Sequence, residues 1–219
     1  MSFSDCFLLF KKKSVCPVCS RGMGSGLLLC PSCRTLLRSA SCRTIRCSGR
    51  FPLLVAAPYR GPFRHAVLRF KNGGQTHLSP VLAQLMLESF MAFSGKRVNG
   101  PELVTWVPGD RRRTAIRGFH PPEMLAGSIA RGLQLPAEGL LGRTHADAQT
   151  GRSPEERRTR LAGTFRLCSR RSVAGRRILL VDDVVTTGST FEEAVRVLQR
   201  NGAGDVWCLA FAGGEKLFD

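Results

Sequence analysis

The sequence predicts an α/β protein, a parallel sheet flanked by helices, with a small cysteine-rich segment ahead of it. The apolar run at residues 178–181 is typical of a buried parallel strand, and Gly188 marks a turn before a helical pattern. The same order of strand and helix recurs upstream, as a parallel sheet requires. Two Cys-x-x-Cys pairs stand before the first predicted strand. These three observations define the fold class.

Local signals along the chain predict the individual elements. Residues 53–57 are apolar and β-favouring, and Gly61-Pro62 separates that strand from a helical run. Apolar side chains recur at helical spacing in residues 78–93, which predicts a helix that faces the core. Gly202 stops the last helix. The expected order is strand 53–57, helix 63–70, helix 78–93, strand 103–107, helix 121–133, polar loop 142–160, strand 178–181, helix 191–201 and strand 206–212.

The length suits one α/β domain with a small appendage, since the chain has 219 residues. We predict that residues 1–50 form the cysteine-rich region and that residues 51–219 form the α/β domain. No run approaches the roughly 18 apolar residues of a membrane span. The apolar patch at residues 7–10 precedes three lysines, the reverse of the order in a signal peptide. The sequence therefore predicts a cytoplasmic protein without a membrane span.

The formal charge of +17 is concentrated in two regions. Residues 1–60 carry ten Lys and Arg against one acid, and residues 96–180 carry seventeen against seven. A solvated arginine-rich surface and a track that binds nucleic acid both explain such an excess. The uneven distribution favours the track, so phosphate-rich partners are expected.

Side chains that can bind a sugar phosphate gather where the strand at residues 178–181 ends. Two adjacent carboxylates can accept hydrogen bonds from vicinal sugar hydroxyls, and the amides and hydroxyls after them lie at a predicted helix start, where phosphate binds. A ribose 5-phosphate satisfies both halves. A helix cap or a salt-bridged acid pair is the alternative. The predicted site comprises Asp182, Asp183, Thr186, Thr187, Gly188, Ser189 and Thr190.

The cysteine spacing predicts a metal site. Two Cys-x-x-Cys knuckles separated by ten residues can aim four thiolates at one point, the tetrahedral geometry that structural zinc prefers. A redox disulfide and an iron–sulfur cluster are the alternatives. Cys42 and Cys47 are spaced too loosely for a knuckle and suggest the remnant of a second cluster. The predicted ligands are Cys16, Cys19, Cys30 and Cys33.

The motif at residues 178–190 resembles the phosphoribosyl pyrophosphate (PRPP) motif of the type I phosphoribosyltransferases, and the whole chain resembles the ComF competence family. The chain departs from the family at His120-Pro121, where Asn-Gln is usual, and at Ala146, where threonine is usual. The segments that carry the resemblance are the Cys-x-x-Cys pairs, YRGPFRHAVLRFKNGG at 59–74, VPGDRRRTAIRGF at 107–119, Gln149 with the arginine-rich stretch to Arg158, and the PRPP motif.

The resemblance implies a parallel sheet behind a small zinc finger with four cysteine ligands, and a role in DNA uptake during natural transformation. It also implies that Asp182 and Asp183 hold the ribose hydroxyls of PRPP, while residues 186–190 enclose the 5-phosphate. Mg²⁺ would be carried largely by the diphosphate and ribose oxygens of the ligand. Candidates for the diphosphate or its hood are Lys71, Arg111 and Arg117.

Three functions stay open from the sequence. The first is a PRPP-binding protein of the ComF type that assists the processing of single-stranded DNA, with other competence proteins as further partners. The second is a metabolic nucleobase phosphoribosyltransferase. For that function, Thr186 stands where enzymes for 6-oxopurines carry an acid, which disfavours those substrates. The third is a non-enzymatic nucleic-acid adaptor. Fold analogy does not by itself establish catalysis, so transfer of the phosphoribosyl group stays open.

Overall fold

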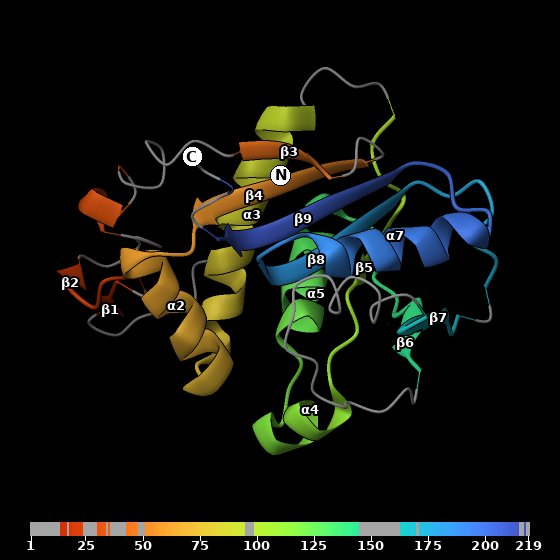
Figure 1. Cartoon of the computed structure of the whole chain (residues 1–219). Helices are drawn as coiled ribbons and strands as arrows, with labels where there is room; N and C mark the ends of the chain where they lie inside the picture. Colours follow the sequence, from red (N-terminus) through yellow and green to blue (C-terminus); the bar gives the residue numbers. More distant parts are fainter. Residues whose placement is uncertain are drawn as a thin grey trace.

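The computed structural model describes residues 14–16, 18–23, 30–33, 35, 43–47, 51–94, 99–144, 163–169, 171–214 and 217. Its centre is a five-stranded sheet with the strand order β3-β4-β9-β8-β5 (Figure 1). β3 is antiparallel to β4, and the other four strands are parallel to one another. The strands are β3 (Arg43–Cys47), β4 (Phe51–Pro58), β5 (Leu103–Trp106), β8 (Ile178–Val185) and β9 (Val206–Gly213).

Helices cover both faces of the sheet because its strands send alternate apolar side chains into two cores. Leu179 and Val181 of β8 lie in one core, whereas Ile178 and Leu180 lie in the other. This alternation is what the two-residue period of a strand dictates. The first core is closed by α2 (Gly61–Asn72), α3 (Ser79–Ser94) and α5 (Pro121–Leu133), and the second by α7 (Ser189–Arg200).

The structure confirms the predicted fold class and places a strand or helix at each position where the sequence predicts one. One boundary differs in a way that matters for function. β8 continues past residue 181 to Val185, because it stays paired with β9 as far as Gly213. The acid pair Asp182 and Asp183 therefore lies within the sheet rather than after the strand.

Some elements were not predicted. The short helix α4 (Arg111–Arg117) buries none of its residues, so it lacks the apolar period that marks a helix in a sequence. The 3₁₀ turn η2 (Thr76–Leu78) leads into α3. β6 (Leu141–Arg143) and β7 (Phe165–Leu167) form a two-stranded ribbon at the two ends of the expected polar loop. Most of that loop lies outside the described residues.

The sheet also takes in part of the predicted cysteine-rich region. β3 pairs along its whole length with β4, so residues 43–47 precede the predicted boundary at residue 50 yet belong to the sheet. A second two-stranded ribbon, β1 (Ser14–Val15) with β2 (Gly22–Met23), carries the first cysteine knuckle. The division into residues 1–50 and 51–219 stays a prediction. Among the described residues, no helix combines the length and apolar content needed to cross a membrane.

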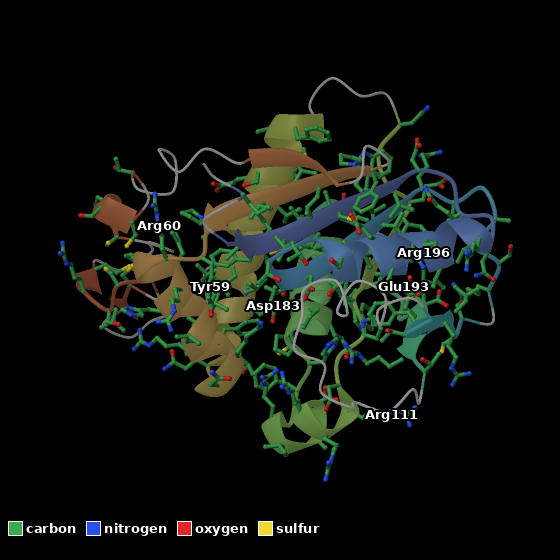
Figure 2. The ribbon with its side chains drawn as sticks, viewed as in Figure 1. Tyr59, Arg60, Arg111, Asp183, Glu193 and Arg196 are labelled. Atoms are coloured by element: carbon green, nitrogen blue, oxygen red, sulfur yellow. The ribbon has the colours of Figure 1, made fainter. Side chains whose placement is uncertain are left out.

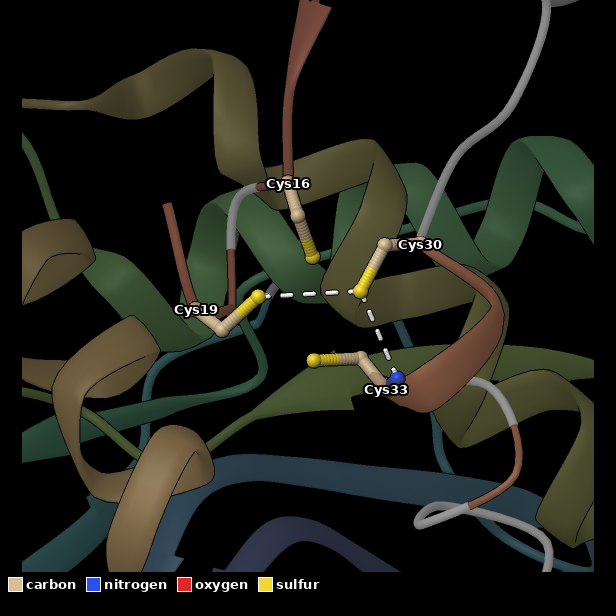
Figure 3. Close-up of side chains that lie close together, drawn as sticks. All are labelled: Cys16, Cys19, Cys30 and Cys33. Carbon is tan, nitrogen blue, oxygen red and sulfur yellow. Dashed lines mark hydrogen bonds between the residues drawn. The ribbon is translucent and has the colours of Figure 1, made fainter. Parts of the chain in front are cut away.

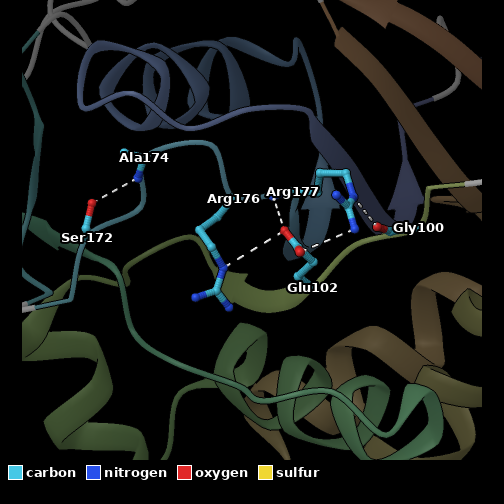
Figure 4. Close-up of polar contacts among 6 residues, drawn as sticks. All are labelled: Gly100, Glu102, Ser172, Ala174, Arg176 and Arg177. Atoms are coloured by element: carbon cyan, nitrogen blue, oxygen red, sulfur yellow. Dashed lines mark hydrogen bonds and ion pairs between the residues drawn. The ribbon is translucent and has the colours of Figure 1, made fainter.

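Glu102 fixes the amino end of the edge strand β5 relative to that of its neighbour β8 (Figure 4). Its Oε2 accepts a hydrogen bond from the Arg177 amide at 3.0 Å, and its Oε1 lies 3.3 Å from the Arg177 guanidinium. Arg177 Nε also donates to the Gly100 carbonyl at 2.8 Å. The Arg177 amide and the neighbouring guanidinium groups lower the pKa of Glu102. These contacts connect β5 to β8 at the edge of the sheet opposite to the candidate site.

Candidate functional site

The carboxyl ends of the parallel strands meet at one edge of the sheet. β8, β9 and β4 end at the same level, since Gly213 of β9 pairs with both Val185 and Pro58. In open α/β sheets this edge is where ligands bind. Figure 2 shows Asp183 near this edge, at the end of β8. The sequence-predicted sugar-phosphate residues therefore lie where the fold places ligand sites.

Asp183 is buried in an ion pair with Lys71. The Lys71 Nζ lies 2.7 Å from Asp183 Oδ1, and the Asp183 side chain is only 8% exposed. Lys71 reaches it from the last turn of α2, a helix whose sequence contains no acid. The sequence named Lys71 as a candidate for the diphosphate, and the structure brings it to the acid pair. Whether it also meets a diphosphate stays a prediction.

Asp182 is the electrostatically costly member of the acid pair. Burial raises its pKa well above the usual value, and the neighbouring Asp183 raises it further. Lys71 and the Asp183 amide, which donates to Asp182 Oδ1 at 2.8 Å, act in the opposite direction without reversing the shift. Part of the Asp182 surface still reaches solvent. The site therefore favours a proton, hydrogen-bond donors or a cation beside these carboxylates.

The hydroxyl-rich turn leads directly from β8 into α7. Gly188 has a φ of 82°, a left-handed conformation that strains any residue with a Cβ, and it stands at the cap of α7. Thr187 Oγ1 and Ser189 Oγ lie 2.9 Å apart across this turn. The first amides of a helix have no partners within the helix and bind anions. The turn thus places hydroxyls and helix-start amides directly after the acid pair, and their binding of a phosphate stays a prediction.

The loop after β5 forms a second wall, and His120 packs against it. A Cβ placed on Gly109 would lie 2.5 Å from His120 Nε2, so this position has no room for a side chain. The imidazole is only 9% exposed and its Nδ1 lies 3.8 Å from Glu123 Oε2. Burial lowers the pKa of His120, Asp183 raises it and Arg117 lowers it. His120, noted in the sequence only as a departure from the family, is therefore close to the acid pair.

The two arginine candidates for the diphosphate lie on α4. Arg117 is half-buried and close enough to His120 to lower the pKa of its imidazole. Arg111 is exposed, and Figure 2 shows it well apart from Asp183. The structure thus brings together Lys71, the acid pair, His120 and the region of Arg117, whereas Arg111 lies at a distance from them. The assignment of Arg111 and Arg117 to the diphosphate stays a prediction.

Glu193 of α7 is a buried acid that was not anticipated from the sequence. A glutamate in a predicted amphipathic helix is expected on the exposed side, so nothing in the sequence marked this one as buried. Its Oε1 accepts a hydrogen bond from the Gly163 amide at 2.6 Å, and its Oε2 lies 2.6 Å from Arg196. Figure 2 shows Glu193 and Arg196 side by side. Glu193 is only 2% exposed, so the two partners compensate for a buried carboxylate. Glu193 therefore connects the backbone at Gly163 to α7, the helix that begins after the Gly188 turn.

The four predicted cysteine ligands converge (Figure 3). Their sulfur atoms all lie within 4.8 Å of one another, and Cys19 Sγ is 3.6 Å from Cys30 Sγ. Four ligands at the zinc–sulfur distance of about 2.3 Å would have their sulfurs about 3.8 Å apart in a tetrahedron. The arrangement therefore suits one metal ion and is too open for a disulfide. The side chains of Cys42 and Cys47 lie outside the described residues.

Backbone hydrogen bonding prepares one of these thiols for a metal. The Cys33 amide donates to Cys30 Sγ at 3.4 Å, which is the main cause that lowers the pKa of Cys30 to about 7. Burial raises the pKa of Cys19 and of Cys33. Four uncompensated thiolates so close together would repel one another. A divalent cation removes that repulsion, as it does in structural zinc sites with four cysteine ligands.

A mostly parallel sheet with an acid pair near the carboxyl end of β8, followed by a glycine turn and a helix start, is typical of an α/β protein of the phosphoribosyltransferase type. In agreement, residues 123–216 match the family model of the phosphoribosyl transferase domain. The chain is 34% identical over 207 residues to the DNA utilization protein YhgH of Escherichia coli O157:H7, an alignment that covers 89% of both chains. It is 29% identical over 211 residues to Competence protein F of Haemophilus influenzae, with 92% of both chains covered. The chain belongs to the ComF family, as the sequence resemblance indicated.

A solved structure is also similar to part of this chain. The glutamine PRPP amidotransferase from B. subtilis, complexed with ADP and GMP, is 20% identical with a TM-score of 0.38. The similarity covers 62% of this chain and 25% of that one.

Proposed function

We propose that this chain binds PRPP together with Mg²⁺ and assists the handling of incoming single-stranded DNA in the cytoplasm during natural transformation. The proposal of a PRPP site rests on one observation. Asp182, Asp183 and the turn at Gly188 lie together at the carboxyl edge of the sheet. The names of the relatives, DNA utilization protein and Competence protein F, support the link to DNA.

The pocket chemistry follows from the charges of the acid pair. Two ribose hydroxyls donate hydrogen bonds to Asp182 and Asp183, while the 5-phosphate accepts from the amides at the start of α7. Mg²⁺ on the ligand supplies the positive charge that two adjacent carboxylates beside a diphosphate need. Once the hydroxyls and the cation compensate Asp183, Lys71 is released from its ion pair and can turn to the diphosphate. Lys71, Arg111 and Arg117 are the proposed cations for that group.

The four cysteines are proposed to hold one structural Zn²⁺. Their sulfur separation suits the tetrahedral zinc geometry, and zinc needs no redox partner. The described part of the finger has few apolar side chains of its own, so the metal would supply much of its folding free energy. It also packs on the body of the protein, since Cys16 and Cys33 lie in the same core as α2 and α3.

Thermal unfolding with and without PRPP and Mg²⁺ tests the pocket. At a ligand concentration of 100 times Kd, the gain in stability is about 2.7 kcal/mol, and about 3 °C per kcal/mol for a chain of this size predicts a rise of roughly 8 °C. The double substitution Asp182→Asn/Asp183→Asn should abolish this rise. If the double variant were protected as well as the wild type, the ligand assignment would fail.

The single variant Asp182→Asn, which keeps the ion pair between Lys71 and Asp183, separates loss of the ligand from loss of the fold. The raised pKa of Asp182 means that its protonated form stabilises the fold below the ordinary aspartate pKa, and that this contribution is lost as the pH rises through the folded pKa. Asp182→Asn removes the loss, so the unliganded variant should melt at or above the wild-type temperature at pH 8. Asp205→Asn, an exposed acid just before β9, is the matched control and should keep full protection by PRPP.

A further inference from the structure

Most of the surface of α4 is exposed and makes no packing contacts with the rest of the described structure. None of its seven residues is buried, and Ile116 is 89% exposed, the highest value among the exposed large apolar side chains of the described residues. Caps at both ends hold it instead. The Asp110 side chain accepts from the Arg113 amide at 2.9 Å, and Gly118 ends the helix with a φ of 77°. Because its caps keep α4 helical without packing, its exposed side is a preformed surface on which a partner can bind.

The helical period divides α4 into two sides. Thr114 faces inward, because a Cβ on Gly109 would lie 3.2 Å from its Oγ1. At 100° per residue, Arg111 and Arg117 flank Thr114 on this inward side. Arg112 and Ile116 lie on the opposite side, Arg113 lies at the border of that side next to Arg117, and all three are exposed. We call these three residues the outer face of α4. Its composition is two guanidinium groups with one apolar side chain between them.

The charge of the surroundings indicates a polyanion as the partner. α4 contains four arginines and no acid, and α2, which follows β4 at the same edge of the sheet, contains no acid either. A second copy of this chain is disfavoured, because an arginine-rich face would meet another on chains that each carry +17. A lipid surface is disfavoured as well. One isoleucine supplies at most about 3 kcal/mol of apolar burial, and even a whole acyl chain gives only marginal membrane binding.

We propose that the outer face of α4 binds single-stranded nucleic acid, with Arg112 and Arg113 on consecutive phosphates and Ile116 against a base. This inference rests on the proposed function and locates its DNA contact beside the PRPP pocket rather than on the finger alone. Single strands expose their bases, which an apolar side chain between two cations can contact, whereas a duplex hides them. Figure 1 shows α4 at one end of the molecule, apart from the sheet.

The test measures binding of a fluorescent 20-residue oligothymidylate by anisotropy at several salt concentrations. Each phosphate contact in a single strand contributes about 0.7 to the slope of log affinity against log salt. Arg112→Ala/Arg113→Ala should therefore reduce the slope by about 1.4 and the affinity at 0.1 M salt by roughly 10- to 30-fold. Ile116→Ser should lower the affinity about fivefold at every salt concentration without changing the slope. Arg112→Lys/Arg113→Lys should restore the slope.

The matched control removes two exposed arginines from other helices, Arg131→Ala/Arg200→Ala, at the opposite edge of the sheet. It should change neither slope nor affinity beyond what the same loss of net charge produces in non-specific binding.

If the Arg112/Arg113 variant kept the wild-type slope while the wild type bound DNA, the inference would be overturned and the proposed function would stand. Failure of the wild type to bind, or binding only of vesicles with anionic lipids, would overturn both the DNA role and this surface. Protection by PRPP should be unchanged in the variant, since both replaced side chains are exposed and neither is assigned to the PRPP site.

Discussion

The ion pair between Lys71 and Asp183 is predicted to hold the candidate site together in the absence of ligand. Replacing Lys71 by Met keeps the length of the side chain and removes its charge, which leaves two adjacent carboxylates at the end of β8. The direct attraction of unit charges 2.7 Å apart is about 6 kcal/mol at an effective dielectric constant of about 20. The Lys71 side chain is 26% exposed, so water replaces part of this attraction in the variant.

The loss also has an upper limit set by proton uptake. Protonating an ordinary aspartate at pH 7 costs about 4 kcal/mol, and Asp182, whose pKa is already raised, takes up a proton more easily. We therefore expect Lys71→Met to reduce the free energy of unfolding by about 2 to 3 kcal/mol, below the roughly 3 to 5 kcal/mol for a fully buried pair because Lys71 is partly exposed. For a chain of this size the melting temperature should fall by roughly 6 to 9 °C.

The pH dependence separates this mechanism from simple loss of packing. Lys71 lowers the pKa of Asp182, so without it that pKa rises further. A raised folded-state pKa gives stability that is present at low pH and lost as the pH rises through it. The effect of Lys71→Met should thus be small at pH 5 and largest at pH 8. Lys71→Arg should behave like the wild type, as should Arg64→Met on the exposed side of α2. A melting temperature unchanged by Lys71→Met, or a decrease equal at both pH values, would refute the argument.

Two further predictions concern the walls of the site and the finger. Gly109→Ala should reduce the free energy of unfolding by about 1 to 3 kcal/mol through the clash with His120, and Gly109→Ala/His120→Ala should recover part of it, as denaturant titration of the four proteins can show. If the two substitutions proved additive, the contact would not exist in solution. Purified protein should contain one zinc ion per chain by metal analysis, Cys16→Ser should lose it and exposed Cys168→Ser should keep it. A full complement of zinc in Cys16→Ser would contradict the four-cysteine site.

The sequence predicted those parts of the fold that depend on local apolar patterns. β8 and α7 are visible in the sequence because buried strands are continuous apolar runs and amphipathic helices have a period. α4 was missed because it depends on its caps at Asp110 and Gly118 and not on burial. β3 was missed because its sequence, Arg43–Cys47, is not a continuous apolar run. It forms a strand because it pairs with β4.

The candidate site shows the same division between local and distant information. The acid pair and the turn are adjacent in the chain, so one motif was enough to predict both. The environment of the acids was not predictable in the same way, since Lys71 and His120 come to Asp183 from α2 and from the start of α5. The resemblance named Lys71 for a different role, and His120 stood out only as an unusual residue. Distances between elements that are far apart in sequence need the assembled sheet.

The length of β8 explains why the acid pair has an electrostatic cost. The strand stays paired with β9 through Val185, and this pairing places both acids within the sheet, where Asp183 is buried and Asp182 is half-buried. Lys71 compensates only Asp183 directly, and the pKa of Asp182 remains raised in spite of it. The unliganded fold therefore retains an electrostatic cost that hydroxyl donors and a divalent cation would remove together. A sugar diphosphate with Mg²⁺ brings both, whereas a free phosphate brings neither. Consequently, phosphate alone should protect the fold far less than PRPP with Mg²⁺, although both can reach the amides at the start of α7.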